Sequence, residues 1–181
     1  MKKTTIAMCV SAASSMLAAC GGSSDSLSTS ATQLPRLSAA QPATLSGNCA
    51  ALAARLTFAN TTFTSVADVP AGTLKVAGKS VPEHCVIQGK MNQRTSTVDG
   101  QAYAIGFEMR LPIAWNGRFF YQANGGLDGN VTPATGVLSG GGSLNNALNM
   151  GFAVISSDAG HSASQNPLFG LDPPGASRLR L

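Results

Sequence analysis

The sequence predicts an α/β protein built on a mixed, partly parallel β-sheet. Residues 101–111 alternate between apolar and mixed positions, which indicates a strand with one covered face. The apolar runs 118–123 and 152–156 are continuous, as is typical of strands covered on both faces. A glycine-rich stretch and a helical pattern separate these two runs. The second half of the chain therefore predicts a strand–helix–strand unit with parallel pairing.

The other elements follow from shorter patterns. Pro112 lacks a backbone donor and should end the long strand. Ser143 is a suitable cap for a helix through Met150, and Gly151 suits the position after that helix. The chain before position 100 predicts a short helix over 49–59, strands over 72–76 and 84–91, and a polar loop over 92–100. His84 is expected at the surface of its strand, and Glu108 and Arg110 are expected to form a solvated pair.

The N-terminus has the pattern of an export signal. Two lysines precede a short apolar segment, and small residues lead to Cys20. We expect residues 1–19 to be a lipoprotein signal peptide and Cys20 to carry the lipid, which would hold the exported protein on a membrane surface at the periplasmic or outer-membrane face. The alternative is an ordinary cleaved signal with an incidental cysteine. The Ser-, Thr- and Ala-rich residues 20–47 predict a disordered tether.

Charge and cysteine content narrow the possible partners. The net charge of +4 comes from four basic residues at the two ends of the chain, and the rest is balanced. A basic patch for nucleic acid is therefore not expected. Of the four cysteines, Cys9 lies in the signal and Cys20 is assigned to the lipid. Cys49 and Cys85 remain and predict a disulfide, with two buried free thiols as the alternative; no metal site is expected.

Four ordered blocks of sequence resemble the tannase/feruloyl-esterase family, which includes hydrolases of terephthalate mono-esters. The resemblance runs over residues 49–172. The blocks are Arg110-Leu111-Pro112 with Trp115-Asn116-Gly117-Arg118-Phe119, then Asn124-Gly125-Gly126, then Ala147-Leu148 with Gly151-Phe152-Ala153-Val154, then Ser157-Asp158-Ala159-Gly160-His161.

The resemblance implies the N-terminal portion of an α/β-hydrolase fold, over 48–172, that stops before the nucleophile elbow and the lid. It implies hydrolysis of carboxylic esters, with a small aromatic ester as substrate. The family's catalytic Ser, Asp and His, and the calcium site of its lid, would all lie downstream, so no catalytic residue and no cofactor are expected in this chain. Residues 173–181 depart from the family pattern, which predicts a frameshift or a gene-model truncation after Asp172.

The resemblance also assigns candidate site residues. Gly125 and Gly126 follow an apolar strand and are candidates for an oxyanion hole, with a tight turn as the alternative. Asn124, Asp158 and His161 are expected to shape loops or to line the pocket, with a catalytic role for Asp158 and His161 as the alternative. No Gly-x-Ser-x-Gly motif is present.

A second hypothesis is a small lipoprotein with a ligand-binding or structural role. Against it, a sheet that stops early would expose residues 152–156 as a raw edge strand.

Overall fold

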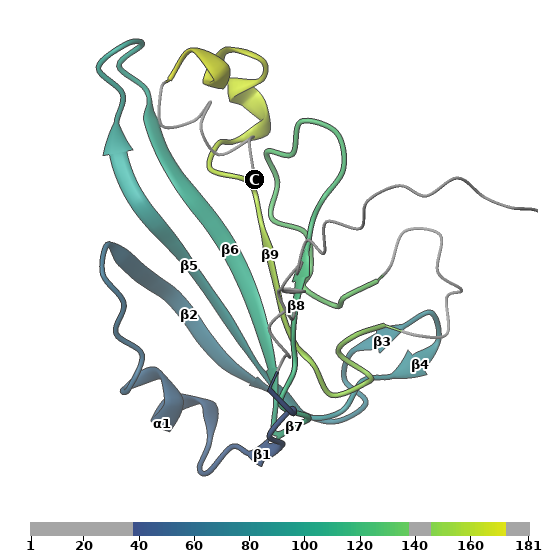
Figure 1. Ribbon diagram of the computed structural model, residues 1–181. Coiled ribbons are helices and arrows are strands. Elements are labelled where there is room, and N and C mark those ends of the chain that lie inside the picture. The colour runs from purple at the N-terminus through teal and green to yellow at the C-terminus, as the bar shows by residue number, and fades with distance from the viewer. Residues whose placement is uncertain (1–37, 138–145, 173–181) are drawn as a thin grey trace, which may run out of the picture. The chain divides into compact units, whose positions relative to one another are not determined.

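The computed structural model describes residues 38–137 and 146–172, and its main element is a five-stranded sheet (Figure 1). The strands lie in the order β2 (Thr61–Val69), β5 (His84–Thr95), β6 (Ala102–Pro112), β9 (Ala153–Ser157) and β8 (Phe119–Gln122). All neighbours are antiparallel except β8 and β9, which are parallel. The predicted mixed, partly parallel sheet is confirmed.

The β5–β6 hairpin forms the centre of the sheet. Its register runs from His84 opposite Pro112 to Thr95 opposite Ala102, so the predicted strands are found and the predicted polar loop is shorter than expected. Gly89 is required within β5, because a Cβ there would lie 2.6 Å from the ring of Phe107. That ring also makes an edge-on contact with Phe63. The missing side chain at Gly89 thus makes room on β5 for the contact between Phe63 of β2 and Phe107 of β6.

Short elements surround the sheet. The helix α1 (Cys49–Ala53) begins where the Asn48 side chain accepts a hydrogen bond from Ala51, and it ends well before the predicted residue 59. The predicted strand at 72–76 is reduced to β3. The remaining elements are β1 (Ala43–Thr44), β3 (Lys75–Val76), β4 (Lys79–Ser80), β7 (Ala114–Trp115), η1 (Ala163–Gln165) and η2 (Leu168–Leu171).

The boundary expected at residue 47 is shifted. Residues 43–44 form β1, which pairs with β7, so part of the segment that was predicted as a disordered tether is a strand. Cys20 and the predicted signal peptide lie outside the described residues, as does the predicted tail at 173–181. Within 38–137 and 146–172, no helix is long and apolar enough to cross a membrane.

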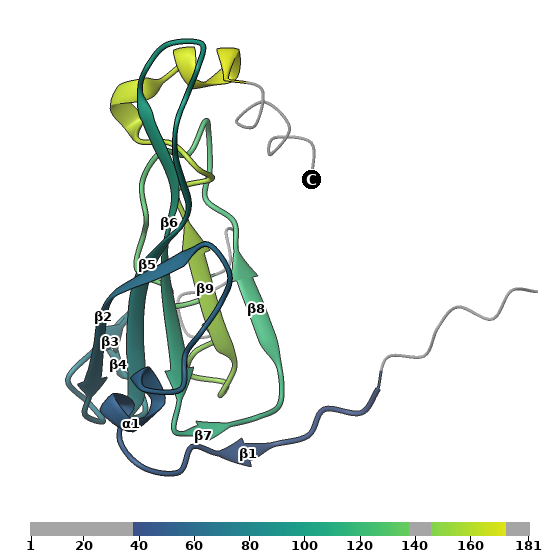
Figure 2. The same cartoon turned by 90° about the vertical axis from the view of Figure 1, so that its left-hand side faces the viewer.

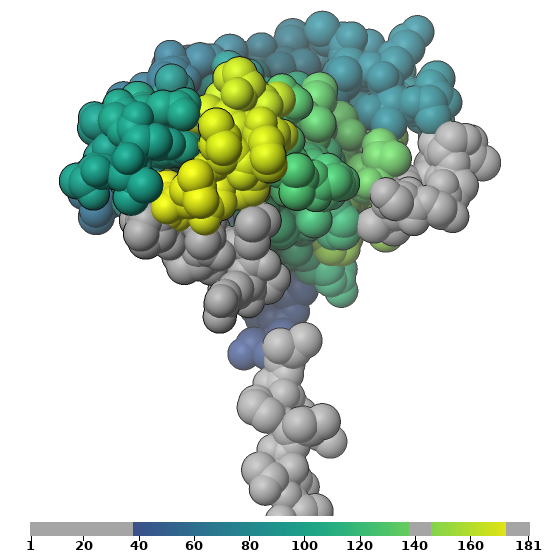
Figure 3. Space-filling model, turned by 90° about the horizontal axis from the view of Figure 1, so that it is seen from above, coloured from purple at the N-terminus to yellow at the C-terminus, as the bar shows by residue number. Residues whose placement is uncertain are grey.

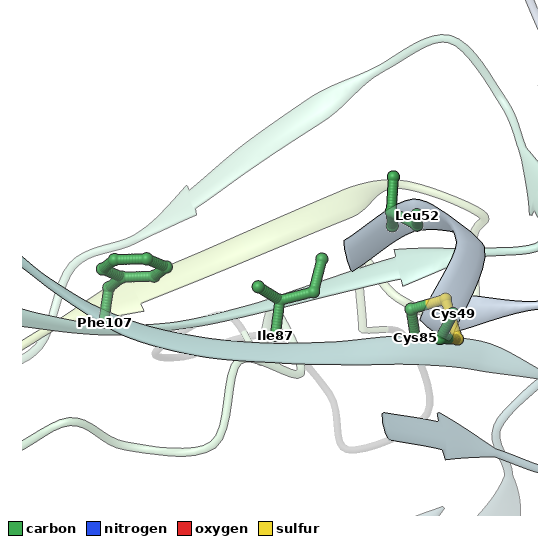
Figure 4. Close-up of a cluster of buried hydrophobic side chains, with 5 residues drawn as sticks. All are labelled: Cys49, Leu52, Cys85, Ile87 and Phe107. Atoms are coloured by element: carbon green, nitrogen blue, oxygen red, sulfur yellow. A yellow bond between two sulfur atoms is a disulfide. The ribbon is translucent and has the colours of Figure 1, made fainter. Parts of the chain in front are cut away.

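Two apolar clusters cover opposite faces of the sheet, because neighbouring residues along a strand alternate between faces. The first joins α1 to β5 and β6, and the Cys49–Cys85 disulfide lies within it (Figure 4). These are the two cysteines that were expected to pair. They are 36 positions apart in the sequence, so the loop-closure model gives about 4 kcal/mol of stabilisation. The second cluster consists of Val81, Ala134, Ala147, Leu148 and Val154.

The predicted helix at 143–150 is not found in its described part. Asn146 forms an isolated antiparallel bridge with Val137, residues 147–151 form turns, and 143–145 lie outside the described ranges. The side chain of Asn146 accepts a hydrogen bond from the backbone of Asn149 at 2.9 Å. This cap leaves room for only one turn before Gly151, whose φ of +82° ends it.

The predicted burial of the two parallel strands is wrong for β8. β8 lies at the margin of the sheet beside β9 (Figure 2), and Phe119 and Tyr121 are 58% and 54% exposed. Phe120 points to the other face and packs on the second cluster. β9 is an interior strand between β6 and β8, so the raw edge expected at 152–156 is found one strand further out.

Candidate functional site

The two parallel strands bring the candidate residues to one end of the sheet. β8 and β9 run in register from Phe119 opposite Ala153 to Gln122 opposite Ser156. The loop after β8 and the segment after β9 therefore leave the same edge, where ligands bind in open α/β sheets. Figure 3 shows this end, with the segment after β9 between the β5–β6 hairpin and the loop after β8.

Backbone hydrogen bonds join these two segments. Gly129 donates to the carbonyl of Asp158 at 3.2 Å, and Ala163 donates to the carbonyl of Gly129 at 2.8 Å. Gly129 fits because a Cβ there would lie 2.7 Å from the backbone of Ala163. The loop after β8 is therefore fixed against the segment after β9 by its own main chain.

Gly125 and Gly126 form an open turn in this loop. Both residues are exposed, and in the part of the chain that the structure describes neither N–H has an acceptor. Gly126 has a φ of +71°, and a Cβ on either glycine would meet nothing within 4 Å. Free amides in a fixed turn can donate to an anionic oxygen, which is the chemistry of an oxyanion hole.

Asn124 anchors this turn to the end of β9. Its side-chain amide donates to the carbonyl of Ser157 at 2.7 Å, and its oxygen accepts from the Thr132 hydroxyl at 2.6 Å. The same amide also reaches the carbonyl of Asn130 at 3.2 Å. Both polar groups of Asn124 are therefore hydrogen-bonded to the end of β9 and to the loop itself, and these bonds hold the glycine pair in place.

Asp158 shapes the segment after β9. One carboxylate oxygen accepts hydrogen bonds from the backbone of Gly106 at 2.9 Å and of Gly160 at 2.8 Å. Burial raises the pKa of this carboxyl, and the two backbone donors oppose that rise. A Cβ at Gly106 would lie 2.6 Å from the other Asp158 oxygen, so glycine at 106 makes room for the carboxylate.

His161 is buried beside these residues. Its side chain is 2% exposed and its ring stacks on Phe169 at 3.6 Å between centroids. Neither ring nitrogen has a hydrogen-bond partner among the described residues, and no hydrogen bond joins His161 to Asp158 there. Burial raises the pKa of the nearby Asp128 carboxyl, and the charge of His161 acts against that rise. Asp158 and His161 therefore do not form a catalytic dyad in this structure.

A buried polar network lies further down the sheet, where the sequence predicted solvated side chains. His84 is 1% exposed, and Glu108 is 7% exposed. Arg110 donates to Glu108 at 2.8 Å and also contacts Nε2 of His84 at 2.9 Å. The prediction of a surface histidine and a solvated pair is wrong, because Ala134 and its neighbours cover this face and Ala134 donates to Glu108 at 3.0 Å.

The protonation of His84 follows from its two contacts. Nδ1 lies 2.7 Å from the carbonyl of Pro82, which can only accept, so Nδ1 carries the proton. Nε2 then accepts from Arg110, and the ring is neutral. Burial, the largest cause, lowers the pKa of His84 from its ordinary value of 6.5.

One group of metal-ligating residue types occurs within the described ranges. It consists of Cys49, Asp68 and Cys85. The disulfide occupies both sulfurs, and Asp68 accepts a hydrogen bond from the backbone of Cys49 at 3.0 Å. The group therefore offers no thiolate and is a structural contact.

Comparisons with known proteins agree on one group of relatives. A family model described as "Tannase and feruloyl esterase" matches residues 85–176. The chain is 42% identical to mono(2-hydroxyethyl) terephthalate hydrolase from Piscinibacter sakaiensis over 102 residues, which cover 52% of this chain and 17% of that protein. It is 28% identical to an uncharacterized esterase of Agrobacterium fabrum over 130 residues, which cover 68% of this chain and 23% of that protein.

Two solved structures from Aspergillus oryzae are similar to the described fold. One is an esterase, with a TM-score of 0.52 and 25% identity over 72% of this chain and 25% of that one. The other is feruloyl esterase B, with a TM-score of 0.52 and 26% identity over 72% of this chain and 24% of that one. The chain thus spans about a quarter or less of the length of each of these four proteins.

Proposed function

Because this chain belongs to the tannase and feruloyl esterase family, and its sheet is part of an α/β-hydrolase fold, we propose that it is the N-terminal part of a carboxylic ester hydrolase for esters of aromatic acids. The substrate class rests on the relatives, one of which is named for a terephthalate mono-ester and another for feruloyl esters.

One observation carries the proposal: two unpaired backbone amides follow the parallel strand β8. During acyl transfer, negative charge develops on the carbonyl oxygen of the ester. A fixed N–H group about 3 Å from that oxygen stabilises the transition state by roughly 3–4 kcal/mol. In α/β-hydrolases, one such donor comes from a glycine-rich loop after an early strand. Gly125 and Gly126 stand in that position, and their N–H groups have no acceptor within residues 38–137 and 146–172.

We further propose that these 181 residues do not hydrolyse esters by themselves. The sequence contains no Gly-x-Ser-x-Gly motif. Ser156 and Ser157 belong to β9 and are 0% and 9% exposed, so neither lies on the sharp strand-to-helix turn that a serine nucleophile needs. An assay of this chain with a simple aryl ester should therefore show no turnover above background.

A chimera tests the oxyanion role. The region of the Piscinibacter hydrolase that is 42% identical would be replaced by the matching region of this chain, and hydrolysis of mono(2-hydroxyethyl) terephthalate would be measured. We expect an active chimera. Gly125→Pro removes one N–H, whereas Gly125→Ala keeps it, so only the proline variant should lose kcat, by about 100- to 1,000-fold with KM little changed.

Gly126 needs a different comparison, because its positive φ strains any other residue. Gly126→Ala in the chimera should lower kcat by moving the turn. Gly100→Ala is the matched control, since Gly100 has a φ of +70° against +71° and equally open surroundings. Equal kcat in all glycine variants of the turn would remove the oxyanion assignment.

We also propose that the protein is exported and that Cys20 carries a lipid. The Cys49–Cys85 disulfide supports this proposal, because disulfides persist in oxidising compartments. In a bacterial host, labelled fatty acid should enter the wild-type chain and should not enter Cys20→Ala. Equal labelling of both chains would contradict the lipid assignment.

A further inference from the structure

A cavity of about 470 Å³ lies at the same end of the sheet, between the end of β5, the start of β6 and the segment after β9. Its walls include Lys90, Arg94, Tyr103, Asp158 and His161. The proposed oxyanion site uses the backbone amides of Gly125 and Gly126 and none of these side chains. The size of the cavity suits a small organic ligand.

Arg94 lines this cavity and has unsatisfied donors. Its Nη2 pairs with the carboxylate of Asp172. Its Nε and Nη1 atoms are buried and have no partner among the described residues. Buried polar groups nearly always find a hydrogen-bond partner, so these two nitrogens call for an acceptor that the described residues do not supply.

His161, in the segment after β9, also lacks hydrogen-bond partners among the described residues. Its ring is 2% exposed and is held by stacking on Phe169, yet neither nitrogen makes a hydrogen bond within the described ranges. A neutral imidazole offers one donor, and a charged one offers two. Packing therefore fixes the position of a ring whose nitrogens make no hydrogen bond to any residue that the structure describes.

The neighbouring polar groups indicate which ligand fits. Asp158 already accepts two backbone hydrogen bonds through one oxygen, and the Tyr103 hydroxyl donates to Asp99 at 2.7 Å. Arg94 stacks over the Tyr103 ring at 5.1 Å, and Lys90 adds a second cation. The unmet groups that line the cavity are thus the two Arg94 nitrogens and the His161 ring, with the Tyr103 ring as one wall; Asp158 and Asp172 balance the charges of Lys90 and Arg94, and the unpaired Asp128 oxygen near His161 is not part of the lining. We propose that this cavity binds a small carboxylate, which accepts hydrogen bonds from Arg94 and His161.

Saturation-transfer NMR on the full chain at low concentration tests the site with sodium benzoate as the probe. We expect saturable binding of benzoate. Benzamide has the same ring without the charge and should bind at least about tenfold more weakly. No saturable binding of benzoate to the folded chain, or equal binding of benzamide, would overturn the proposal. Inorganic phosphate that binds as tightly as benzoate would refute the carboxylate class.

Variants locate the binding. Arg94→Gln should weaken benzoate binding by about tenfold or more. Lys90→Gln serves if Arg94→Gln fails to fold, because Lys90 is exposed; it should weaken binding about two- to threefold. Lys79→Gln in β4 is the matched control, with the same charge change away from the cavity, and should bind like the wild type. Equal affinity in Lys90→Gln and Lys79→Gln, or full affinity in folded Arg94→Gln, would place the ligand elsewhere. These outcomes are independent of ester hydrolysis.

Discussion

His84 should make the folded chain less stable in mild acid. Its Nδ1 donates to Pro82, and its Nε2 accepts from Arg110 at 2.9 Å. A second proton on the ring would replace this hydrogen bond with an N–H facing the guanidinium. Burial and the charge of Arg110 both lower the pKa of His84 in the folded chain. In the unfolded chain the ring is exposed to water and keeps its ordinary pKa.

The sign and size of the effect follow from linkage. The unfolded chain takes up the proton near the ordinary pKa of 6.5, and the folded chain takes it up only at lower pH. The stabilisation by neutral His84 is therefore fully present above about pH 6.5 and is lost as the pH falls toward the lowered folded pKa. Between about pH 7.5 and 5.5 the loss is at most about 1.4 kcal/mol, if the folded ring stays neutral throughout.

Urea unfolding at both pH values measures this loss. Comparison of the wild type with His84→Gln isolates the contribution of this ring. His84→Gln should abolish most of the pH dependence, whatever its effect on stability at neutral pH. The buried carboxyl of Asp158, whose pKa is raised, contributes with the opposite sign and is common to the wild type and His84→Gln. A wild type and a His84→Gln variant with the same pH dependence would refute the assigned hydrogen bonds.

Three further outcomes test the packing. Replacing Cys49 and Cys85 together with alanine should lower the free energy of unfolding by about 4 kcal/mol in urea titrations, and a loss below 1 kcal/mol would show that the cross-link restrains little. Gly89→Ala should destabilise by about 1–3 kcal/mol in the same titration, because its Cβ would lie 2.6 Å from the Phe107 ring and 2.7 Å from a backbone oxygen; an unchanged midpoint would contradict this close approach. Tyr121→Lys on the open strand β8 should reduce self-association in sedimentation, relative to the exposed control Val98→Lys, since charge blunts an edge strand.

The strands that the sequence predicts best are those whose pattern depends on the chain alone. The alternation over 101–111 becomes β6, since one face of that strand meets an apolar cluster along its length. β2 was not predicted, because Thr and Ser occupy many of its positions and it lies at the edge of the described sheet. β-propensity without an apolar face is a weak signal, and only pairing with β5 reveals this strand.

Burial was harder to predict than strand identity, because it depends on neighbours that are distant in sequence. The run 118–123 is apolar throughout, but only Phe120 of β8 packs on a cluster, while Phe119 and Tyr121 face outward. The opposite error occurred at His84 and Arg110. These polar residues were expected to be exposed to solvent, but the segment around Ala134 covers them. In the structure, Glu108 and Arg110 lie on one face of the hairpin, where they oppose Gln88 and Val86 of β5.

The candidate site shows both the reach and the limit of local sequence. Asn-Gly-Gly predicts a turn in any fold, because glycine tolerates a positive φ. What makes this turn a site is the carbonyl of Ser157, 33 positions later, which accepts from Asn124 only because β8 and β9 are parallel and in register. The hydroxyl of Thr132 donates a second hydrogen bond, to the side-chain oxygen of Asn124, at 2.6 Å. A one-residue slip between β8 and β9 would turn Asn124 away from that carbonyl. The turn that carries the two glycine amides would then no longer be held in place. The register of the parallel pair, rather than the glycines themselves, therefore sets the direction in which Gly125 and Gly126 donate.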